Sequence, residues 1–270
     1  MTRAADVDLF TFENNQLAYR RFGYGPTTLL AFHGFGQTGQ VFAKYEKLLG
    51  DRYTLLAIDL FFHGSSQYRS NHLLTKTVWQ RLIDAFLQAN AVDRFSVVGF
   101  SLGGRFALTT AELLASRVDQ LILIAPDGIT PSRWYKFATG SSLGRRLFRF
   151  VLTHLTFLST IGHFLTRAGL LNRTLMRFVE ISLDTPERRN LVYQSWTQFR
   201  LIFPDLERVG DLINEMRLET HFFMGSFDRI IPTSYVLPLT KRLYQFELTI
   251  VKTGHNLLIE LAGERLAKQV

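Results

Sequence analysis

The chain has 270 residues, a length that fits one large α/β domain with or without an inserted subdomain. It contains no cysteine, so disulfides, thiolate nucleophiles and cysteine-ligated metals are excluded. The formal net charge is +8, and residues 128–179 hold eight Lys and Arg without any Asp or Glu, so this segment accounts for the whole excess of positive charge.

The amino-terminal stretch argues against a signal peptide. Residues 1–16, MTRAADVDLFTFENNQ, carry acids where a signal peptide needs an apolar core, and no run of about 18 uncharged apolar residues follows later. We therefore expect a soluble, cytoplasmic protein.

Apolar runs alternate with helical patterns in the first half of the chain. Strands are expected at 17–22, 28–33, 53–59, 94–100 and 120–126. Helices are expected at 40–49, 73–90 and 102–116. Nearly all-apolar strands separated by helices predict a mostly parallel, doubly wound sheet that is covered on both faces.

The alternation stops after Pro126. Residues 127–203 are rich in Phe, Leu, Arg and Thr at helical spacing and contain no convincing strand, so they are interpreted as a helical insertion. The alternation then returns, with strands expected at 218–225 and 245–253 and helices at 234–243 and from 257.

A glycine pattern early in the chain allows two interpretations. Gly34, Gly36 and Gly39 stand in G-x-G-x-x-G spacing after an expected strand, and Asp59 follows twenty residues beyond Gly39. This arrangement is typical of a dinucleotide-binding loop. A flexible glycine-rich turn after a strand suits the oxyanion loop of a serine hydrolase equally well.

The segment GFSLGG, residues 99–104, lies between an apolar strand and a helix. In the G-x-S-x-G pattern the serine occupies a sharp strand-to-helix turn, and the two glycines avoid collisions with neighbouring backbone. The turn presents Ser101 Oγ near a helix N-terminus, where developing negative charge is favoured. Ser101 is therefore the candidate nucleophile.

A serine nucleophile needs a base and an acid that orients the base. His255 follows the last expected strand, and Asp228 follows the strand before it, so both belong to the carboxyl edge of the sheet with Ser101. Asp127 competes with Asp228 for the acid's role but has the turn-forming Gly128 beside it. The remaining histidines are interpreted as surface or core residues.

The segments FHGFG, GFSLGG, GSFDRIIP and TGHNLLIE, in this order, resemble the α/β-hydrolase superfamily of the serine-nucleophile, helical-cap type. The resemblance implies a hydrolase core of residues 1–127 and 204–270 and a cap of residues 128–203. It implies catalysis by Ser101, His255 and Asp228, without cofactor or metal. A dinucleotide-binding fold would leave this constellation unexplained.

The same resemblance assigns the residues around the triad. The backbone N–H groups of Phe35 and Leu102 would form the oxyanion hole, and His33 would hold the loop. The segment DLFFHGSS resembles the family's D-x-x-G-H-G-x-S turn with Phe62 in place of the usual glycine, which predicts a differently shaped turn and an aromatic ring near the pocket. Phe100 and Arg105 are the other expected substrate contacts.

We expect hydrolysis of a carboxylic ester or related acyl bond. The alternatives are carbon–carbon bond hydrolysis and a pyruvate-eliminating synthase like that of the menaquinone pathway, in which Arg105 would hold a carboxylate. A non-catalytic binding protein is the alternative from another class.

The basic cap is open to three interpretations: a solvated face, a contact for an anionic substrate, or a docking surface for an anionic membrane and its lipid esters. No nucleic-acid-binding motif is present, so a nucleic acid is not an expected partner. The sequence does not indicate an oligomeric state.

Overall fold

The computed structural model describes residues 6–154, 180 and 182–268. The chain divides into two compact units, one formed by residues 1–130 with 201–270 and the other by residues 131–200. The sequence placed the corresponding boundaries at 127/128 and 203/204.

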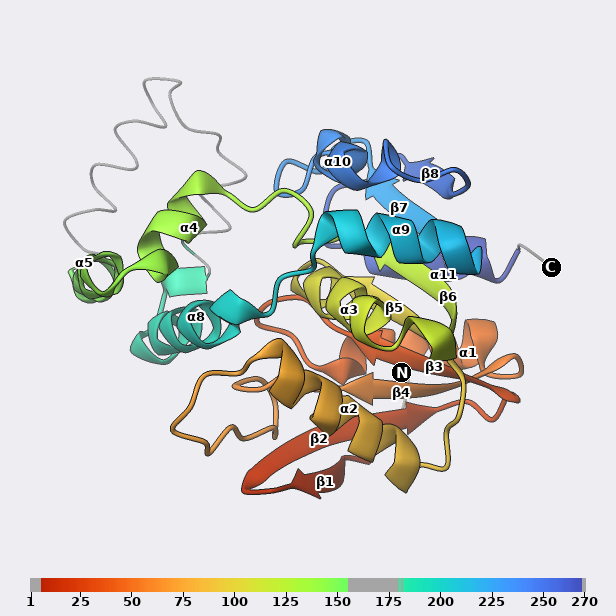
Figure 1. Ribbon diagram of the computed structural model, residues 1–270, viewed down its shortest axis with the longest axis horizontal. Coiled ribbons are helices and arrows are strands. Elements are labelled where there is room, and N and C mark those ends of the chain that lie inside the picture. The colour runs from red at the N-terminus through yellow and green to blue at the C-terminus, as the bar shows by residue number, and fades with distance from the viewer. Residues whose placement is uncertain (1–5, 155–179, 181, 269–270) are drawn as a thin grey trace. The chain divides into compact units, whose positions relative to one another are not determined.

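The first unit is built on an eight-stranded sheet whose strand order is β1-β2-β4-β3-β5-β6-β7-β8 (Figure 1). The strands are β1 (Asp8–Phe12), β2 (Asn15–Phe22), β3 (Thr27–Phe32), β4 (Tyr53–Ile58), β5 (Phe95–Phe100), β6 (Val118–Ile124), β7 (Glu219–Gly225) and β8 (Glu247–Val251). The β1–β2 and β2–β4 pairings are antiparallel, and every other pairing is parallel. The predicted fold class is confirmed.

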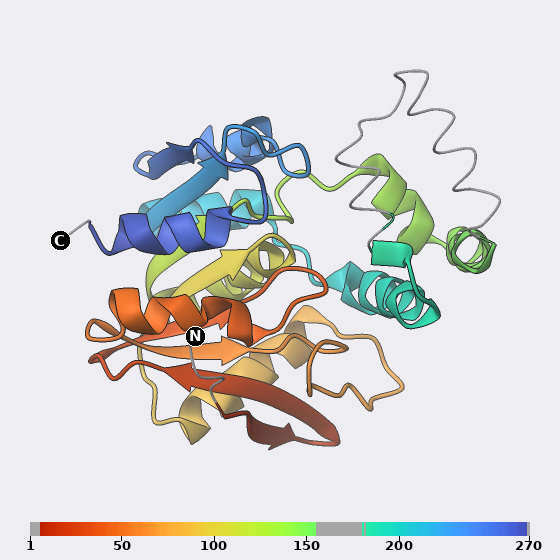
Figure 2. The same cartoon turned by 180° about the vertical axis from the view of Figure 1, so that it is seen from behind.

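Helices cover both faces of this sheet. In Figure 1, α2 (Lys76–Ala89), α3 (Leu102–Leu113) and α9 (Leu206–Met216) lie in front of the strands. Figure 2 shows α1 (Ala43–Leu49) and α11 (Leu258–Leu266) in front of the opposite face. The short α10 (Leu237–Thr240) precedes β8. The central strand β5 is buried along its whole length, as its apolar sequence requires when both faces are covered.

Two helices of this unit, α2 and α9, begin at polar capping residues. The Thr75 side chain accepts a hydrogen bond from the backbone N–H of Val78 at the start of α2, and Asp205 caps α9 in the same way. The apolar side of α2 is buried and includes Trp79 and Phe86.

The described part of the second unit is helical. It consists of α4 (Arg133–Gly140), α5 (Ser142–Thr153) and α8 (Pro186–Gln198), followed by a 3₁₀ turn. Its core brings together Tyr135, Phe148 and Trp196, with the Phe148 and Trp196 rings stacked at 5.1 Å. The helical prediction for 155–179 lies outside the described residues.

Two elements of the first unit were not predicted from the sequence, namely β1 and α9. The expected helix at 234–243 is a 3₁₀ turn followed by the single turn of α10, and the expected strand at 245–253 is shorter at both ends. No helix among the residues described above is both long enough and apolar enough to cross a bilayer.

Candidate active site

Ser101 occupies a sharp turn between β5 and α3. Its backbone has φ 51° and ψ −117°, a left-handed conformation that is strained for a residue with a side chain. The Ser101 N–H donates to the Ile124 carbonyl oxygen at 3.0 Å, and the Ser101 carbonyl accepts from the N–H groups of Gly104 and Asp127, both at 2.8 Å. These hydrogen bonds hold the turn in its strained form.

The glycines beside Ser101 are required by close backbone packing. A Cβ atom at Gly99 would collide with the Gly103 carbonyl oxygen, and one at Gly103 would collide with the Phe32 carbonyl oxygen. The chain therefore brings β3, β5 and the start of α3 closer together than any larger residue would permit.

The structure brings Ser101, His255 and Asp228 together at the carboxyl edge of the sheet. His255 Nε2 lies 3.0 Å from Ser101 Oγ, and His255 Nδ1 lies 2.6 Å from Asp228 Oδ2. Because a carboxylate can only accept, Nδ1 carries the imidazole proton, which leaves Nε2 free to accept the proton of the Ser101 hydroxyl.

Asp228 is itself held firmly. Its second oxygen, Oδ1, accepts from the N–H groups of Ile230 at 2.8 Å and Ile231 at 3.0 Å. The carboxyl group is buried, and the two backbone donors fix its orientation. A buried anion with a fixed orientation is suited to holding an imidazole in one tautomer.

Asp127, the competing acid, has other partners. Its carboxylate forms an ion pair with Arg105 and accepts from the Gly128 N–H at 2.7 Å. The Arg105 guanidinium also lies 4.0 Å from the centre of the Phe203 ring. The buried Arg105 side chain thus fastens the loop after β6. Its expected contact with substrate stays a prediction.

The two expected oxyanion donors lie at the ends of β3 and β5. Phe35 belongs to the loop after β3, and Leu102 is the first residue of α3, where helical geometry leaves the N–H unpaired. Among the residues that the structure describes, neither N–H donates to a protein acceptor. Both groups are thus available to a ligand.

His33 holds the loop that carries Phe35. Its Nδ1 donates to the Gly34 carbonyl at 2.7 Å, and its Nε2 accepts from the Leu60 N–H at 2.9 Å. Complete burial, reinforced by the neighbouring His63, lowers the pKa of His33 to about 3. His33 is therefore neutral near pH 7 and serves as a fixed link between two loops.

His63 lies beneath the same loop and was not singled out from the sequence. Its ring packs edge-on against Phe35 at 5.5 Å and lies 5.2 Å from the His33 ring. Burial lowers its pKa as well. The signal that could have identified it is the His-Gly pair in DLFFHGSS, directly after the end of β4.

Asp59 is structural. Its Oδ1 accepts from Arg20 Nη1 and from the Gly39 N–H, both at 2.7 Å, so the buried carboxylate joins β2 to the segment after β3. Its Oδ2 accepts from the Ser65 N–H at 3.4 Å, so both carboxylate oxygens have partners within the protein.

Phe62 and Phe100 are the two phenylalanines that the sequence analysis expected near the pocket. Phe62 has φ 68°, the left-handed conformation that glycine favours, and its half-buried ring packs against Tyr68 at 6.1 Å. Phe100 is buried, and its ring lies 4.9 Å from that of His255. Phe100 therefore packs against the imidazole of His255. Its expected contact with substrate stays a prediction.

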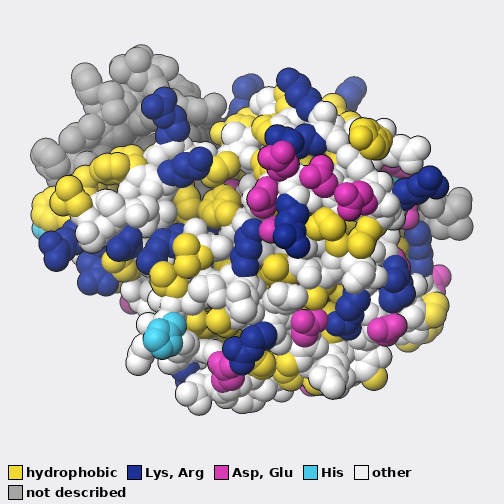
Figure 3. All heavy atoms as spheres, in the orientation of Figure 1, with side chains coloured by type: hydrophobic (Ala, Val, Ile, Leu, Met, Phe, Trp, Pro, Cys, Tyr) yellow, Lys and Arg dark blue, Asp and Glu magenta, His cyan; other side chains and the backbone are white. Residues whose placement is uncertain are grey.

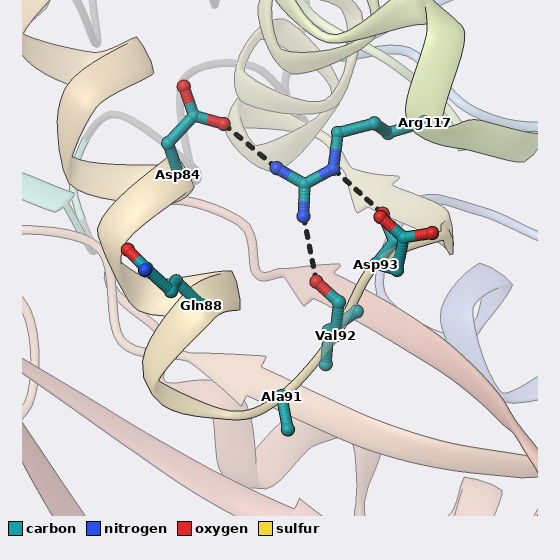
Figure 4. A pocket seen from close by; sticks show the side chains of 6 residues that line it. All are labelled: Asp84, Gln88, Ala91, Val92, Asp93 and Arg117. Carbon is teal, nitrogen blue, oxygen red and sulfur yellow. Dashed lines mark hydrogen bonds and ion pairs between the residues drawn. The ribbon is translucent and has the colours of Figure 1, made fainter.

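A surface hollow at the other edge of the sheet is separate from this site. Figure 4 shows it lined by Asp84, Gln88, Ala91, Val92, Asp93 and Arg117. Arg117 donates to Asp84 Oδ1 at 3.0 Å and to the carbonyl oxygens of Val92 and Asp93, both at 2.7 Å. Its guanidinium is thereby used to tie α2 to the start of β6.

Comparison with known proteins gives several partial likenesses. An uncharacterized protein of Mycobacterium tuberculosis is 32% identical over 120 residues, which make up 44% of this chain and 35% of that protein. The pimeloyl-[acyl-carrier protein] methyl ester esterase of Nitrosomonas europaea is 33% identical over 106 residues, 38% of each chain. The match thus spans little more than a third of these curated relatives.

The likeness in three dimensions extends further. The solved structure of a meta-cleavage product hydrolase from Pseudomonas fluorescens has a TM-score of 0.64 and 20% identity, and the match covers 97% of this chain and 94% of that one. At this identity the likeness shows the fold alone. The sequence model of the family described as alpha/beta hydrolase fold matches residues 27–261. Together with the strand order and the sharp turn at Ser101, this match shows that the chain belongs to the alpha/beta hydrolase fold family.

Proposed function

We propose that the protein is a serine hydrolase that cleaves a carboxylic ester, or a closely related acyl bond, through an acyl-enzyme. The observation that carries the proposal is the continuous hydrogen-bonded chain from Ser101 through His255 to Asp228, with distances of 3.0 and 2.6 Å. A serine hydroxyl becomes a nucleophile when a base at this distance accepts its proton.

In the first half-reaction, Ser101 Oγ bonds to the ester carbonyl carbon while its proton moves to His255 Nε2. Asp228 stabilises the imidazolium that forms. The N–H groups of Phe35 and Leu102 receive the oxyanion, each contributing about 3 kcal/mol to transition-state stabilisation. The intermediate then collapses, the bond to the alcohol oxygen breaks, and that oxygen takes the proton from His255.

In the second half-reaction, water replaces the alcohol. His255 Nε2 accepts a proton from the water as its oxygen bonds to the acyl carbon. Collapse of the second intermediate returns the proton to Ser101 Oγ and releases the carboxylic acid. The chain supplies the nucleophile, the base, the acid and the oxyanion donors, and the only other reactants are the ester and water.

The name of the Nitrosomonas europaea relative, a methyl ester esterase, supports ester chemistry for the aligned segment. The pyruvate-eliminating alternative is weakened because Arg105, its expected carboxylate contact, is buried and paired with Asp127.

Carbon–carbon bond hydrolysis would use the same triad, and the Pseudomonas fluorescens neighbour bears the name of a meta-cleavage product hydrolase. A meta-cleavage product therefore belongs in the assay beside the esters.

The test is hydrolysis of p-nitrophenyl esters from acetate to palmitate by the wild type, Ser101→Ala and Ser116→Ala. Ser116 is exposed, so its replacement controls for loss of a hydroxyl elsewhere. We expect Ser101→Ala to lose about six orders of magnitude in kcat and Ser116→Ala to lose nothing. Equal turnover by Ser101→Ala and wild type would overturn the proposal.

Labelling distinguishes a different substrate from the absence of catalysis. A fluorophosphonate should add its mass to wild-type Ser101 and leave the Ser101→Ala protein unmodified. Labelling without ester turnover, together with cleavage of the meta-cleavage product, would replace ester hydrolysis by carbon–carbon bond hydrolysis. Absence of both labelling and turnover would indicate a binding protein instead.

A further inference from the structure

The second unit carries apolar side chains that its own core does not use. On α5, Leu143, Leu147 and Phe150 are exposed, at 71% for Leu143 and 57% for Phe150. On α4, Trp134 and Phe137 are each at least 50% exposed, and their rings lie 5.7 Å apart. Large apolar side chains gathered on one surface are a mark of an interaction site.

The spacing on α5 shows that its exposed apolar side chains form one stripe. Leu143, Leu147 and Phe150 stand at i, i+4 and i+7, which places them on the same side of the helix. The buried residues of α5, including Phe148 and Leu152, face another direction, and Phe148 packs on Trp196 of α8. The helix thus has a second apolar face beyond the one that folding requires.

Positive charge borders this stripe. Arg146 lies three residues after Leu143 on the adjoining side of α5, and Arg133 and Lys136 lie on α4. All three are exposed, and within the described part of the chain none forms an ion pair. Figure 3 shows the yellow side chains over α4 and α5 with dark blue ones beside them.

The charge of the whole unit has the same sign. Residues 131–200 contain eleven Lys and Arg against three Asp and Glu. A second copy of the chain would bring an equally positive surface against this one, so self-association through it is opposed by repulsion. A nucleic acid would match the charge but not the exposed leucines and phenylalanines. An anionic lipid surface matches both.

We propose that the exposed faces of α4 and α5 dock this protein onto an anionic lipid bilayer. Trp134, Phe137, Leu143, Leu147 and Phe150 would enter the boundary between headgroups and acyl chains. Arg133, Lys136 and Arg146 would remain at the level of the lipid phosphates, which attract each cation. The helices lie on the membrane and do not cross it. This proposal is independent of the chemistry at Ser101.

The test is co-sedimentation with vesicles of phosphatidylcholine, either pure or mixed with the anionic lipid phosphatidylglycerol, which attracts basic segments. Two triple variants separate the two contributions. The apolar variant is Leu143→Ser, Leu147→Ser, Phe150→Ser, and the charge variant is Arg133→Gln, Lys136→Gln, Arg146→Gln. Circular dichroism and thermal midpoints establish that both variants are folded.

Matched control variants lie in the first unit. The apolar control is one triple variant that removes exposed apolar side chains, Tyr244→Ser, Leu248→Ser, Ile250→Ser. The charge control is a second triple variant that removes the same number of exposed cations as the charge variant, Lys47→Gln, Lys241→Gln, Lys268→Gln. Attraction to an anionic surface contributes about a fivefold factor per cation, so the charge variant should bind about a hundredfold more weakly. The apolar variant should lose binding to a similar degree. Both controls should bind as the wild type does.

Trp134 reports directly on insertion. Of the three tryptophans, Trp79 is 1% exposed and Trp196 is half-buried, so Trp134 is the one at the proposed surface. Anionic vesicles should shift the tryptophan emission of wild type and of Ser101→Ala to shorter wavelength, and the shift should disappear in Trp134→Phe.

Three results would overturn the proposal. The first is failure of the wild type to bind vesicles that contain phosphatidylglycerol. The second is binding that the apolar and charge variants retain. The third is binding to DNA of random sequence that exceeds vesicle binding and depends on the same three cations. Because the emission shift is also measured on the Ser101→Ala protein, the outcome is separate from that of the ester assay.

Discussion

At the scale of single residues, the site depends on which side chain each carboxylate contacts. Two aspartates follow strands at the same sheet edge, yet Asp228 contacts His255, whereas Asp127 contacts Arg105. The two side chains are chemically identical, so their different surroundings give them different tasks. The sequence order favoured Asp228, but the pairing of Asp127 with Arg105 could not be predicted, because spacing does not show where a long side chain reaches.

Because the two aspartates have different partners, we expect the same Asp→Asn substitution to affect mainly activity at Asp228 and mainly stability at Asp127. Asp228→Asn should lower kcat by about three to four orders of magnitude, because the neutral amide no longer fixes the tautomer and charge of His255. Asp127→Asn should leave kcat within about threefold, because its carboxylate does not touch the imidazole. It should lower the thermal midpoint by weakening the partly buried ion pair with Arg105. Steady-state kinetics and thermal melts measure both effects. A larger loss of kcat in Asp127→Asn would reverse the assignment of the acid.

At the scale of elements, β1 and α9 were missed for different reasons. The edge strand β1 has no fully buried position, so it lacks the apolar run by which the central strands were recognised. Helix α9 directly follows the segment interpreted as an insertion. The central strands and α3 were predicted because strong hydrophobic patterns and the glycines around Ser101 agree there.

The turn after β4 offers a prediction about backbone strain. Because Phe62 has φ 68°, any residue with a Cβ is strained there, so Phe62→Gly should be about 1 kcal/mol more stable than Phe62→Ala. Both variants lack the ring, so their difference isolates the backbone. Urea unfolding of the two variants measures it.

Tyr68, the ring partner of Phe62, provides the control. Its backbone does not have a positive φ, so Tyr68→Ala should be more stable than Tyr68→Gly by about 0.5 to 1 kcal/mol. Alanine is the more stable residue at such a position because glycine gives the unfolded chain more conformational freedom. The same sign at both positions would contradict a strained turn at Phe62.

At the scale of the whole molecule, buried neutral histidines make stability depend on pH. The pKa of His33 falls from 6.5 to about 3 on folding because burial disfavours the cation, with His63 and Arg20 acting in the same direction. Between these values the unfolded chain binds a proton that the folded chain does not. The stability contributed by neutral His33 is therefore complete above pH 6.5 and decreases as the pH falls toward 3.

The expected slope is about 1.4 kcal/mol per pH unit, so lowering the pH from 6.5 to 5 should cost about 2 kcal/mol of unfolding free energy. His63, whose pKa is also lowered by burial, adds to the same loss. Urea denaturation at a series of pH values measures the slope. His33→Gln should be less stable at pH 7.5 but should show a shallower slope, and equal slopes in the two proteins would exclude His33 as the origin.

The first unit is discontinuous in the sequence, and this has a consequence for the chain during its synthesis. Ser101 lies in the first stretch, whereas Asp228 and His255 lie in the second, and Ser101 and His255 are 154 positions apart. A ribosome therefore makes the nucleophile long before the base that would activate it. On the proposed mechanism the growing chain carries an inert hydroxyl, and hydrolysis begins only when β7 and β8 have joined the sheet.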